Sequence, residues 1–161
     1  MLLLAGKFQS TNAFWENPLM LSAISSFIFA QLVKAIIALT SERRSRIKAA
    51  LVALFWRTGG MPSSHAALVS ALTTATAISE GISSNLFVVT FFLAVIVMRD
   101  AMGVRRSSGI QAKTLNVLGQ RLSENSGSKY QPVKEVQGHT PLEVIVGSLL
   151  GIIIAAAYAY L

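Results

Sequence analysis

Four apolar stretches, each about as long as a bilayer is thick, dominate this chain of 161 residues. A helix needs about 20 mostly apolar residues to cross the hydrocarbon core, and the candidates are residues 18–40, 62–80, 84–104 and 141–161. With 53% hydrophobic and only 13% charged residues, the chain is more apolar than a soluble domain of this length. The sequence therefore predicts an all-α integral membrane helical bundle with about four spanning helices, forming one domain over residues 1–161.

Two of the four stretches carry small residues that suit contact with other helices. Residues 62–80 are rich in Ala, Ser and Thr, which favours a helix that faces protein rather than lipid. Residues 141–161 contain Gly147 and Gly151, a spacing that allows two helices to approach closely. We expect the helix over residues 62–80 to face protein and the helix over residues 141–161 to approach another helix closely.

The connections between the stretches predict two further elements. Residues 47–56 form an apolar run of half a span, which is typical of an interfacial or re-entrant segment. Between residues 110 and 122, apolar side chains recur at roughly helical spacing, which predicts an amphipathic helix lying at the cytoplasmic surface. The sequence "SENSGSK" that follows is typical of a loop.

Basic residues are concentrated in two connections, which orients the bundle. They are Arg43, Arg44, Arg46, Lys48 and Arg57 in the first, and Arg105, Arg106, Lys113, Arg121, Lys129 and Lys134 in the second. By the positive-inside rule both connections are cytoplasmic and both termini extracytoplasmic. The basic residues separate apolar segments instead of forming one stripe, so nucleic acid is not an expected partner. With no cysteine, the chain also lacks thiolate nucleophiles and thiolate metal ligands.

Polar and ionisable residues from all four stretches fall at the predicted cytoplasmic ends. They are Lys34 in the first stretch, Ser63, Ser64 and His65 at the start of the second, Asp100 near the end of the third, and His139 and Glu143 at the start of the fourth. Ionisable residues are costly inside a membrane and usually serve function there. Two histidines, a carboxylate and cations in one layer predict a phosphate site.

The chemistry of phosphate-ester cleavage assigns roles to these residues. A nucleophilic imidazole needs a carboxylate on its other nitrogen, which His139 and Glu143 could supply, and the leaving group needs a proton, for which His65 is the remaining histidine. The transferring phosphoryl group needs fixed donors and a close backbone. Candidates for these roles are Lys34, Arg105, Arg106, Ser63, Ser64 and Gly60. This scheme requires no metal and no cofactor.

Four ordered motifs carry a resemblance that covers residues 18–161. They are "FAQLVK", "GGMPSSHAA", "RDAMGVRRSSGIQA" and "GHTPLEVIVGSLLG". Together they resemble the divergent branch of the phosphatidic acid phosphatase type 2 superfamily, whose members are labelled acid phosphatase/vanadium-dependent haloperoxidase-related. In the parent superfamily, a histidine forms a phosphohistidine, an aspartate four residues later orients it, and a histidine in a P-S-G-H motif protonates the leaving group.

The resemblance implies that His139 is the nucleophile, that Glu143 occupies the aspartate position, that His65 is the proton donor and that Lys34 is the phosphate-binding lysine. The chain departs from the superfamily at Ser64, which replaces the glycine of P-S-G-H. Two superfamily arginines would fall on Val133 and Ser41. We expect Arg105 and Arg106 to replace them, because the phosphate charge must be balanced.

Each candidate also has a structural alternative. Residues 140–143 fit a capping box, so Glu143 could simply satisfy amides at the start of a helix. The sequence "PSS" is an ordinary helix opening, and an isolated His65 is more often structural than catalytic. Arg105, Arg106 and Lys34 could anchor helix ends at the headgroups. Asp100 could pair with a neighbouring cation or histidine, or bind a metal, and pairing is the favoured alternative.

The favoured function is a membrane-embedded phosphatase that hydrolyses a lipid-linked phosphate or diphosphate at the cytoplasmic face through a phosphohistidine. The expected partners are this substrate and membrane lipids, and a homo-oligomer stays open. A non-catalytic protein that binds phospholipid headgroups or a protein partner through the same pocket is the alternative. Vanadate-dependent oxidation is a third possibility, which only the family label favours.

Overall fold

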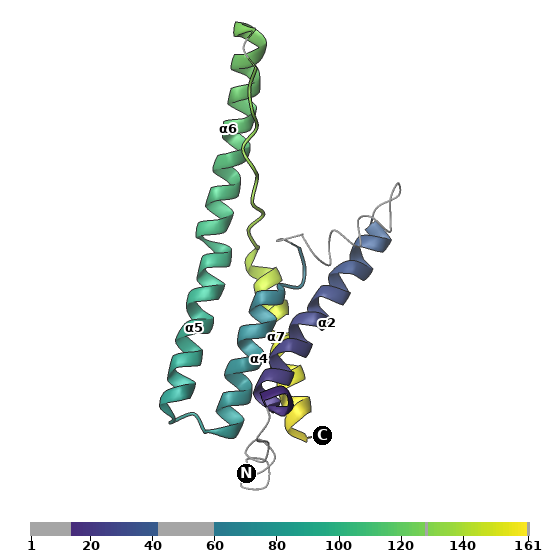
Figure 1. The fold of residues 1–161 in the computed structure, drawn as a ribbon, viewed down its shortest axis with the longest axis vertical. Coiled ribbons are helices and arrows are strands. Elements are labelled where there is room, and N and C mark those ends of the chain that lie inside the picture. The colour runs from purple at the N-terminus through teal and green to yellow at the C-terminus, as the bar shows by residue number, and fades with distance from the viewer. Residues whose placement is uncertain (1–13, 42–59, 128, 161) are drawn as a thin grey trace.

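The computed structural model describes residues 14–41, 60–127 and 129–160, and in these ranges all regular secondary structure is helical (Figure 1). The elements are the short 3-10 helix η1 (Phe14–Glu16) and the α-helices α2 (Pro18–Ser41), α4 (Ser64–Ser79), α5 (Asn85–Met102), α6 (Val104–Ser126) and α7 (Pro141–Tyr160). The segment 47–56, predicted to be interfacial or re-entrant, lies outside the described residues. The predicted all-α class is confirmed.

Three stretches of the described chain are long and apolar enough to cross a membrane. They include α2, α7 and the stretch that begins with α5, and they match three of the four predicted spans. The remaining predicted span, residues 62–80, forms α4. This helix has only 16 residues and is therefore shorter, about 24 Å long at 1.5 Å per residue. The protein is thus an integral membrane helical bundle whose apolar outer surface contacts lipid.

Helix α4 is the central helix of the bundle and packs against α2, α5 and α7 (Figure 1). Its buried face consists mainly of small residues, and Ala71 and Ala75 form a buried cluster with Ala155 and Ala159 of α7. Large apolar side chains of α5, such as Phe92 and Ile96, point outward and are exposed. Small residues inside and large ones outside are typical of membrane bundles, so the prediction that residues 62–80 face protein is confirmed.

The contact between α4 and α7 is a backbone contact made possible by two glycines. A Cβ atom on Gly147 would lie 2.3 Å from the carbonyl oxygen of Ser63, and one on Gly151 would lie 2.1 Å from that of Ala67. The backbone amide of Ser63 also donates a hydrogen bond to the carbonyl oxygen of Glu143, at 3.0 Å. The start of α4 is therefore held in a fixed register against the start of α7.

Helix α6 continues the direction of α5 beyond Gly103 and projects from the bundle, and residues 129–138 return alongside it (Figure 1). We call α6 and this return segment the arm. The predicted amphipathic helix is thus present but longer, and it extends away from the bundle instead of lying across its end. It also includes part of the predicted loop, since the chain turns only at Gly127, where φ is 68°.

The arm differs from the expected surface helix because its packed face is not its apolar face. The apolar residues Ile110, Leu115, Leu118 and Leu122 are exposed. Instead, α6 meets the return segment through glycines: a Cβ on Gly109 would lie 2.0 Å from the carbonyl oxygen of Val136. The return segment thus packs on the glycine face of α6 and leaves the leucines exposed.

Asn116 fastens the return segment to α6 with all of its side-chain hydrogen-bonding capacity. Its Oδ1 accepts hydrogen bonds from the Tyr130 hydroxyl at 2.9 Å and from the Val133 amide at 2.8 Å. Its Nδ2 donates to the Val133 carbonyl oxygen and to Glu135 Oε1, both at 2.9 Å. One side chain in the middle of α6 thus holds three residues of the return segment.

Replacing Asn116 with alanine is expected to release the return segment without unfolding the bundle. The change removes four hydrogen bonds, each worth about 1 kcal/mol net. Amide hydrogen exchange of residues 130–137 should accelerate at least about tenfold, while α4 and α7 keep their protection. Asn125→Ala, an exposed change on the same helix, is the matched control. Equal exchange rates in both variants would contradict the fastening role.

Candidate active site

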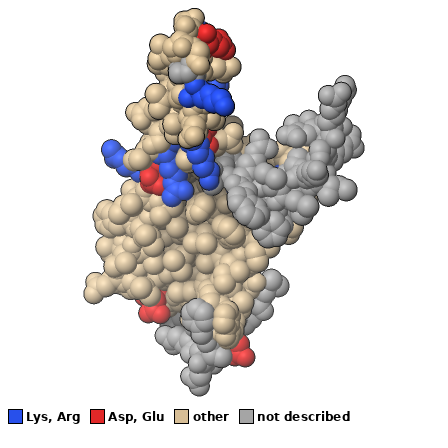
Figure 2. Space-filling view, turned by 45° about the horizontal axis from the view of Figure 1, so that its top comes forward, with Lys and Arg blue, Asp and Glu red and all other residues tan. Residues whose placement is uncertain are grey.

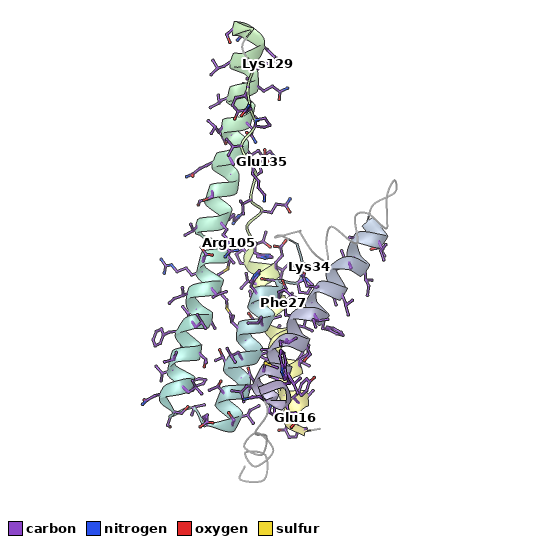
Figure 3. The ribbon with its side chains drawn as sticks, viewed as in Figure 1. Glu16, Phe27, Lys34, Arg105, Lys129 and Glu135 are labelled. Carbon is purple, nitrogen blue, oxygen red and sulfur yellow. The ribbon has the colours of Figure 1, made fainter. Side chains whose placement is uncertain are left out.

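The predicted site residues Lys34, His65, Arg105, His139 and Glu143 come together where the arm joins the bundle. Four elements supply them: α2, α4, the start of α6 and the start of α7. In Figure 3, Lys34 and Arg105 lie close to the level at which the arm leaves the bundle, and Phe27 lies nearer to the end of the bundle that carries Glu16. His65 is close enough to Lys34, Arg105 and His139 to interact with them electrostatically.

His139 and Glu143 form a direct side-chain contact, with 3.0 Å between Nδ1 and Oε2. The same Oε2 atom accepts a hydrogen bond from the Thr140 amide at 3.1 Å, and the Glu143 amide donates to Thr140 Oγ1 at 3.4 Å. The capping box is therefore complete, and its carboxylate also holds the imidazole. Because a carboxylate only accepts hydrogen bonds, Nδ1 carries a proton and Nε2 of the neutral ring keeps its lone pair.

The His139 ring is buried, with 3% of the residue exposed, and its backbone amide donates to the carbonyl oxygen of Ala101 at 3.0 Å. Burial lowers the pKa of His139 below its usual range, and the charges of Lys34 and Arg105 act in the same direction. The hydrogen bond and the negative charge of Glu143 oppose this lowering without cancelling it. At neutral pH the imidazole is therefore uncharged, as a nucleophile requires.

Lys34 is a buried cation, 6% exposed, whose Nζ donates to the hydroxyl of Ser64 at 3.4 Å. Glu143 is near enough to act on it electrostatically. Ser64 thus contacts the predicted phosphate-binding lysine. Ser63 has a structural role instead, because its Oγ caps α4 by accepting from the Ala66 amide and its own amide is bound to Glu143.

His65 is exposed on the surface of the protein chain, and its ring stands edge-on to that of Phe27, with 6.1 Å between the centroids. A T-shaped pair at this distance favours one ring orientation. Phe27 belongs to the apolar first helix, and its sequence position gives no signal that distinguishes it from Phe29, which is exposed on the same helix. The sequence prediction missed it for that reason.

The two consecutive arginines are in different surroundings. Arg105 forms an ion pair with Asp100, with 2.6 Å between Nε and Oδ2. The pairing alternative for Asp100 therefore describes the structure. Arg106 instead lines a cleft of about 470 Å³ between α6 and the return segment. Gly60, Lys113, Glu135, Gln137 and Glu143 also line this cleft.

Lysine and arginine side chains gather where the arm leaves the apolar body, as Figure 2 shows in blue. Within the described residues, this basic zone and the two histidines occupy the same end of the bundle. Glu16 lies at the opposite end (Figure 3). The phosphate-binding residues predicted from sequence did not include Lys113, although it lies seven residues after Arg106 and therefore on the same helix face.

Comparison with known proteins places the chain in a family. Residues 15–154 match the model of the Divergent PAP2 family. A Bacillus subtilis (strain 168) protein described as uncharacterized membrane protein YuiD is 40% identical over 152 residues, which cover 88% of this chain and 93% of the relative. No solved structure shows a significant match. The predicted resemblance is confirmed: the chain belongs to the Divergent PAP2 family.

Proposed function

We propose that this protein is a membrane-embedded phosphatase that hydrolyses a lipid-linked phosphate or diphosphate through a phosphohistidine intermediate. The observation that carries the proposal is the His139–Glu143 pair, a buried and uncharged imidazole held by a carboxylate. A pair that served only to begin α7 would not need a second histidine and a buried lysine at the same level of the bundle. The family membership supports the same reaction class.

In the proposed reaction, Nε2 of His139 attacks the phosphorus atom as the bond between phosphorus and the lipid oxygen breaks. His65, in its protonated form, gives its proton to the departing alkoxide and is then reprotonated from solvent. Water attacks the phosphohistidine, the bond between phosphorus and Nε2 breaks, and the proton that the water loses passes to solvent. Glu143 stabilises the positive charge that His139 acquires. Phosphate leaves, and both histidines return to their starting states.

The negative charge of the transferring phosphoryl group would meet Lys34, Ser64 and Arg105. Lys34 is already desolvated, so its interaction with a phosphate oxygen is stronger than it would be in water. Ser64 offers a hydroxyl donor beside it. Arg105 lies within electrostatic range of both histidines, but its guanidinium is paired with Asp100. A bound phosphate therefore has to compete with that ion pair.

We place this site at the cytoplasmic face, with both termini extracytoplasmic. The support is the distribution of charge: lysine and arginine gather where the arm leaves the bundle (Figure 2), and both histidines lie within electrostatic range of Lys34 and Arg105 at that end. The positive-inside rule puts that end in the cytoplasm. A lipid substrate would then reach the site from the inner leaflet, at headgroup depth.

A second candidate function is the binding of phospholipid headgroups without turnover. Val133 stands where the superfamily has an arginine, and Asn116 holds its backbone on the arm, so no cation is supplied from that position. Together with the Arg105–Asp100 ion pair, this leaves fewer unpaired cations around His139 in the described part of the chain than the parent superfamily provides. A headgroup-binding protein would need fewer.

The two functions are separated by measuring phosphate release from a panel of lipid phosphates and diphosphates by the purified protein in lipid nanodiscs. The phosphatase proposal expects release from at least one lipid and acid-labile incorporation of labelled phosphate into the protein, as a phosphohistidine requires. Binding of the same lipids with no release and no labelling would favour the headgroup-binding function. A phosphorylated residue other than His139 would overturn the mechanism.

The lowered pKa of His139 predicts the acidic side of the pH profile. The neutral ring attacks, so activity is present above the folded-state pKa and is lost as pH falls through it. We expect the acidic limb of kcat/KM for an aryl phosphate to lie below the usual histidine value of about 6.5. In Glu143→Gln the limb should move further toward acid, because the carboxylate no longer favours the imidazolium. A limb above pH 6.5 would contradict the prediction.

A further inference from the structure

We propose that the cleft of the arm is a second anion-binding site, which holds a phosphate group through Arg106 and Lys113. This cleft lies between α6 and the return segment and has a volume of about 470 Å³. Lys34 and Ser64 do not line it, and it adjoins the His139–Glu143 pair through Glu143 and through Gly138, which precedes His139. The inference does not depend on whether the protein hydrolyses phosphate esters.

The backbone determines the shape of the cleft. A Cβ on Gly138 would lie 2.3 Å from the Arg106 Cα, so the return segment touches the α6 backbone at this point. Asn116 fastens the same segment further along the arm by binding Val133 and Glu135. Arg106 and Lys113 are two helical turns apart, about 10.5 Å along the axis at 1.5 Å per residue. Both cations therefore border a cleft whose walls are held at two points.

The acidic and basic side chains that line the cleft differ in their hydrogen-bond partners. Glu143 is bound by His139 and Thr140, and Glu135 accepts a hydrogen bond from Asn116. Arg106 and Lys113 form no ion pair and no hydrogen bond with other described residues, in contrast to Arg105, which is paired with Asp100. The cleft therefore holds two cations and two carboxylates, but among the described residues only the carboxylates have hydrogen-bond partners. The N–H groups of Arg106 and Lys113 are the ones left for a ligand, and charged donors of this kind bind anions.

A phosphate group fits this pair of cations best. The planar guanidinium of Arg106 can bind two phosphate oxygens at once, and the ammonium of Lys113 can neutralise a further charge. The cleft volume lies within the range of sites for small molecules, about 300–1,000 Å³, which exceeds what a single phosphate needs. The ligand is therefore a phosphate-bearing molecule, either a soluble one or the headgroup of a lipid.

The test uses the full chain in nanodiscs of zwitterionic lipid, carrying His139→Ala throughout so that neither probe is hydrolysed, with inorganic pyrophosphate as the soluble probe and short-chain phosphatidate as the lipid probe. Affinity is measured by titration calorimetry at fixed ionic strength. Arg106→Ala and Lys113→Gln are each expected to weaken binding about tenfold or more, as expected for loss of a charged hydrogen bond. Arg121→Ala, which removes an arm cation outside the cleft, is the matched control. Thermal unfolding checks that all three variants are folded.

Weaker binding of both probes by Arg106→Ala and Lys113→Gln supports the site and its general preference for phosphate groups. Weakening of pyrophosphate alone identifies a soluble ligand, and weakening of phosphatidate alone identifies a lipid headgroup. The proposal is overturned if the protein with an intact cleft binds neither probe, or if the cleft variants bind the probes with the same affinity as Arg121→Ala. Binding that depends on Arg106 and Lys113, with no phosphate release by the wild type, would support the cleft site while removing the phosphatase function.

Discussion

His139→Ala should abolish the turnover of every phosphate ester, whereas His65→Ala should lose only those esters whose leaving group needs a proton. Without the His139 imidazole no phosphohistidine can form, and removal of a nucleophile costs at least about 10³-fold in rate. A general acid contributes about 10²–10⁴-fold, and only when the leaving group is a strong base such as an alkoxide. An aryl phosphate leaves as a weakly basic phenolate, so its cleavage should survive in His65→Ala.

Initial rates on an alkyl and an aryl phosphate, measured for wild type and both variants, check this prediction. The ratio of the two substrates within one variant is its own control, because loss of folded protein lowers both rates equally. If His65→Ala keeps the thermal stability of the wild type but loses both esters to the same extent, His65 is not the proton donor. If His139→Ala retains either activity, His139 is not the nucleophile.

The double hydrogen bonding of Glu143 allows its two roles to be separated in the same assay. In Glu143→Gln, the amide oxygen can still accept from the Thr140 amide, so the capping box and the fold should persist. The negative charge that stabilises the His139 imidazolium is lost, so turnover of both esters should fall. Unchanged turnover with unchanged thermal stability would mean that Glu143 serves only the helix.

Gly147→Ala and Gly151→Ala are each expected to destabilise the bundle substantially. The added methyl groups would lie 2.3 Å and 2.1 Å from backbone carbonyl oxygens of α4, which cannot rotate away as a side chain could. Overpacking of this kind costs about 1–3 kcal/mol for each change, and the helices must separate to relieve it. Separation would also move Ser63 away from the Glu143 carbonyl oxygen and disturb the site.

Thermal or SDS unfolding in detergent measures this effect, and Ala157→Val is the matched control. Ala157 is on the same helix but exposed, so two added methyl groups there should change stability little. We expect the glycine variants to unfold well below the control and to lose activity. Glycine variants as stable as Ala157→Val would show that α4 and α7 are not held by backbone contact.

The parts of the fold that follow from local sequence were predictable. Apolar length marked the helices that begin at Pro18 and Pro141, and the Gly147/Gly151 spacing indicated the close contact that α7 makes with α4. The chemistry of a nucleophilic imidazole and the motif of the family paired His139 with Glu143, and the structure has them in contact. These features depend on residues that are near one another along the chain.

The arm was only partly predictable, because its packing depends on residues far apart in sequence. The periodic leucines indicated a helix but not its direction, since their face stays exposed and the glycine face meets the return segment. Asn116 is an ordinary polar residue in sequence, and only its contacts with Tyr130 and Val133 reveal its role. The cleft could not be expected either, because it exists only where the return segment meets α6.

The shared Oε2 atom of Glu143 has a consequence for how this family changes over evolutionary time. One oxygen serves both the helix start, through Thr140, and the imidazole of His139. Under the proposed function, a descendant that gave up catalysis would still need a side-chain oxygen here to begin α7, which glutamate or glutamine can supply, so drift could not freely erase it. Retention of Glu143 in a distant relative therefore says little about activity. The residue whose loss should record a retired enzyme is His139, because its side chain caps no helix.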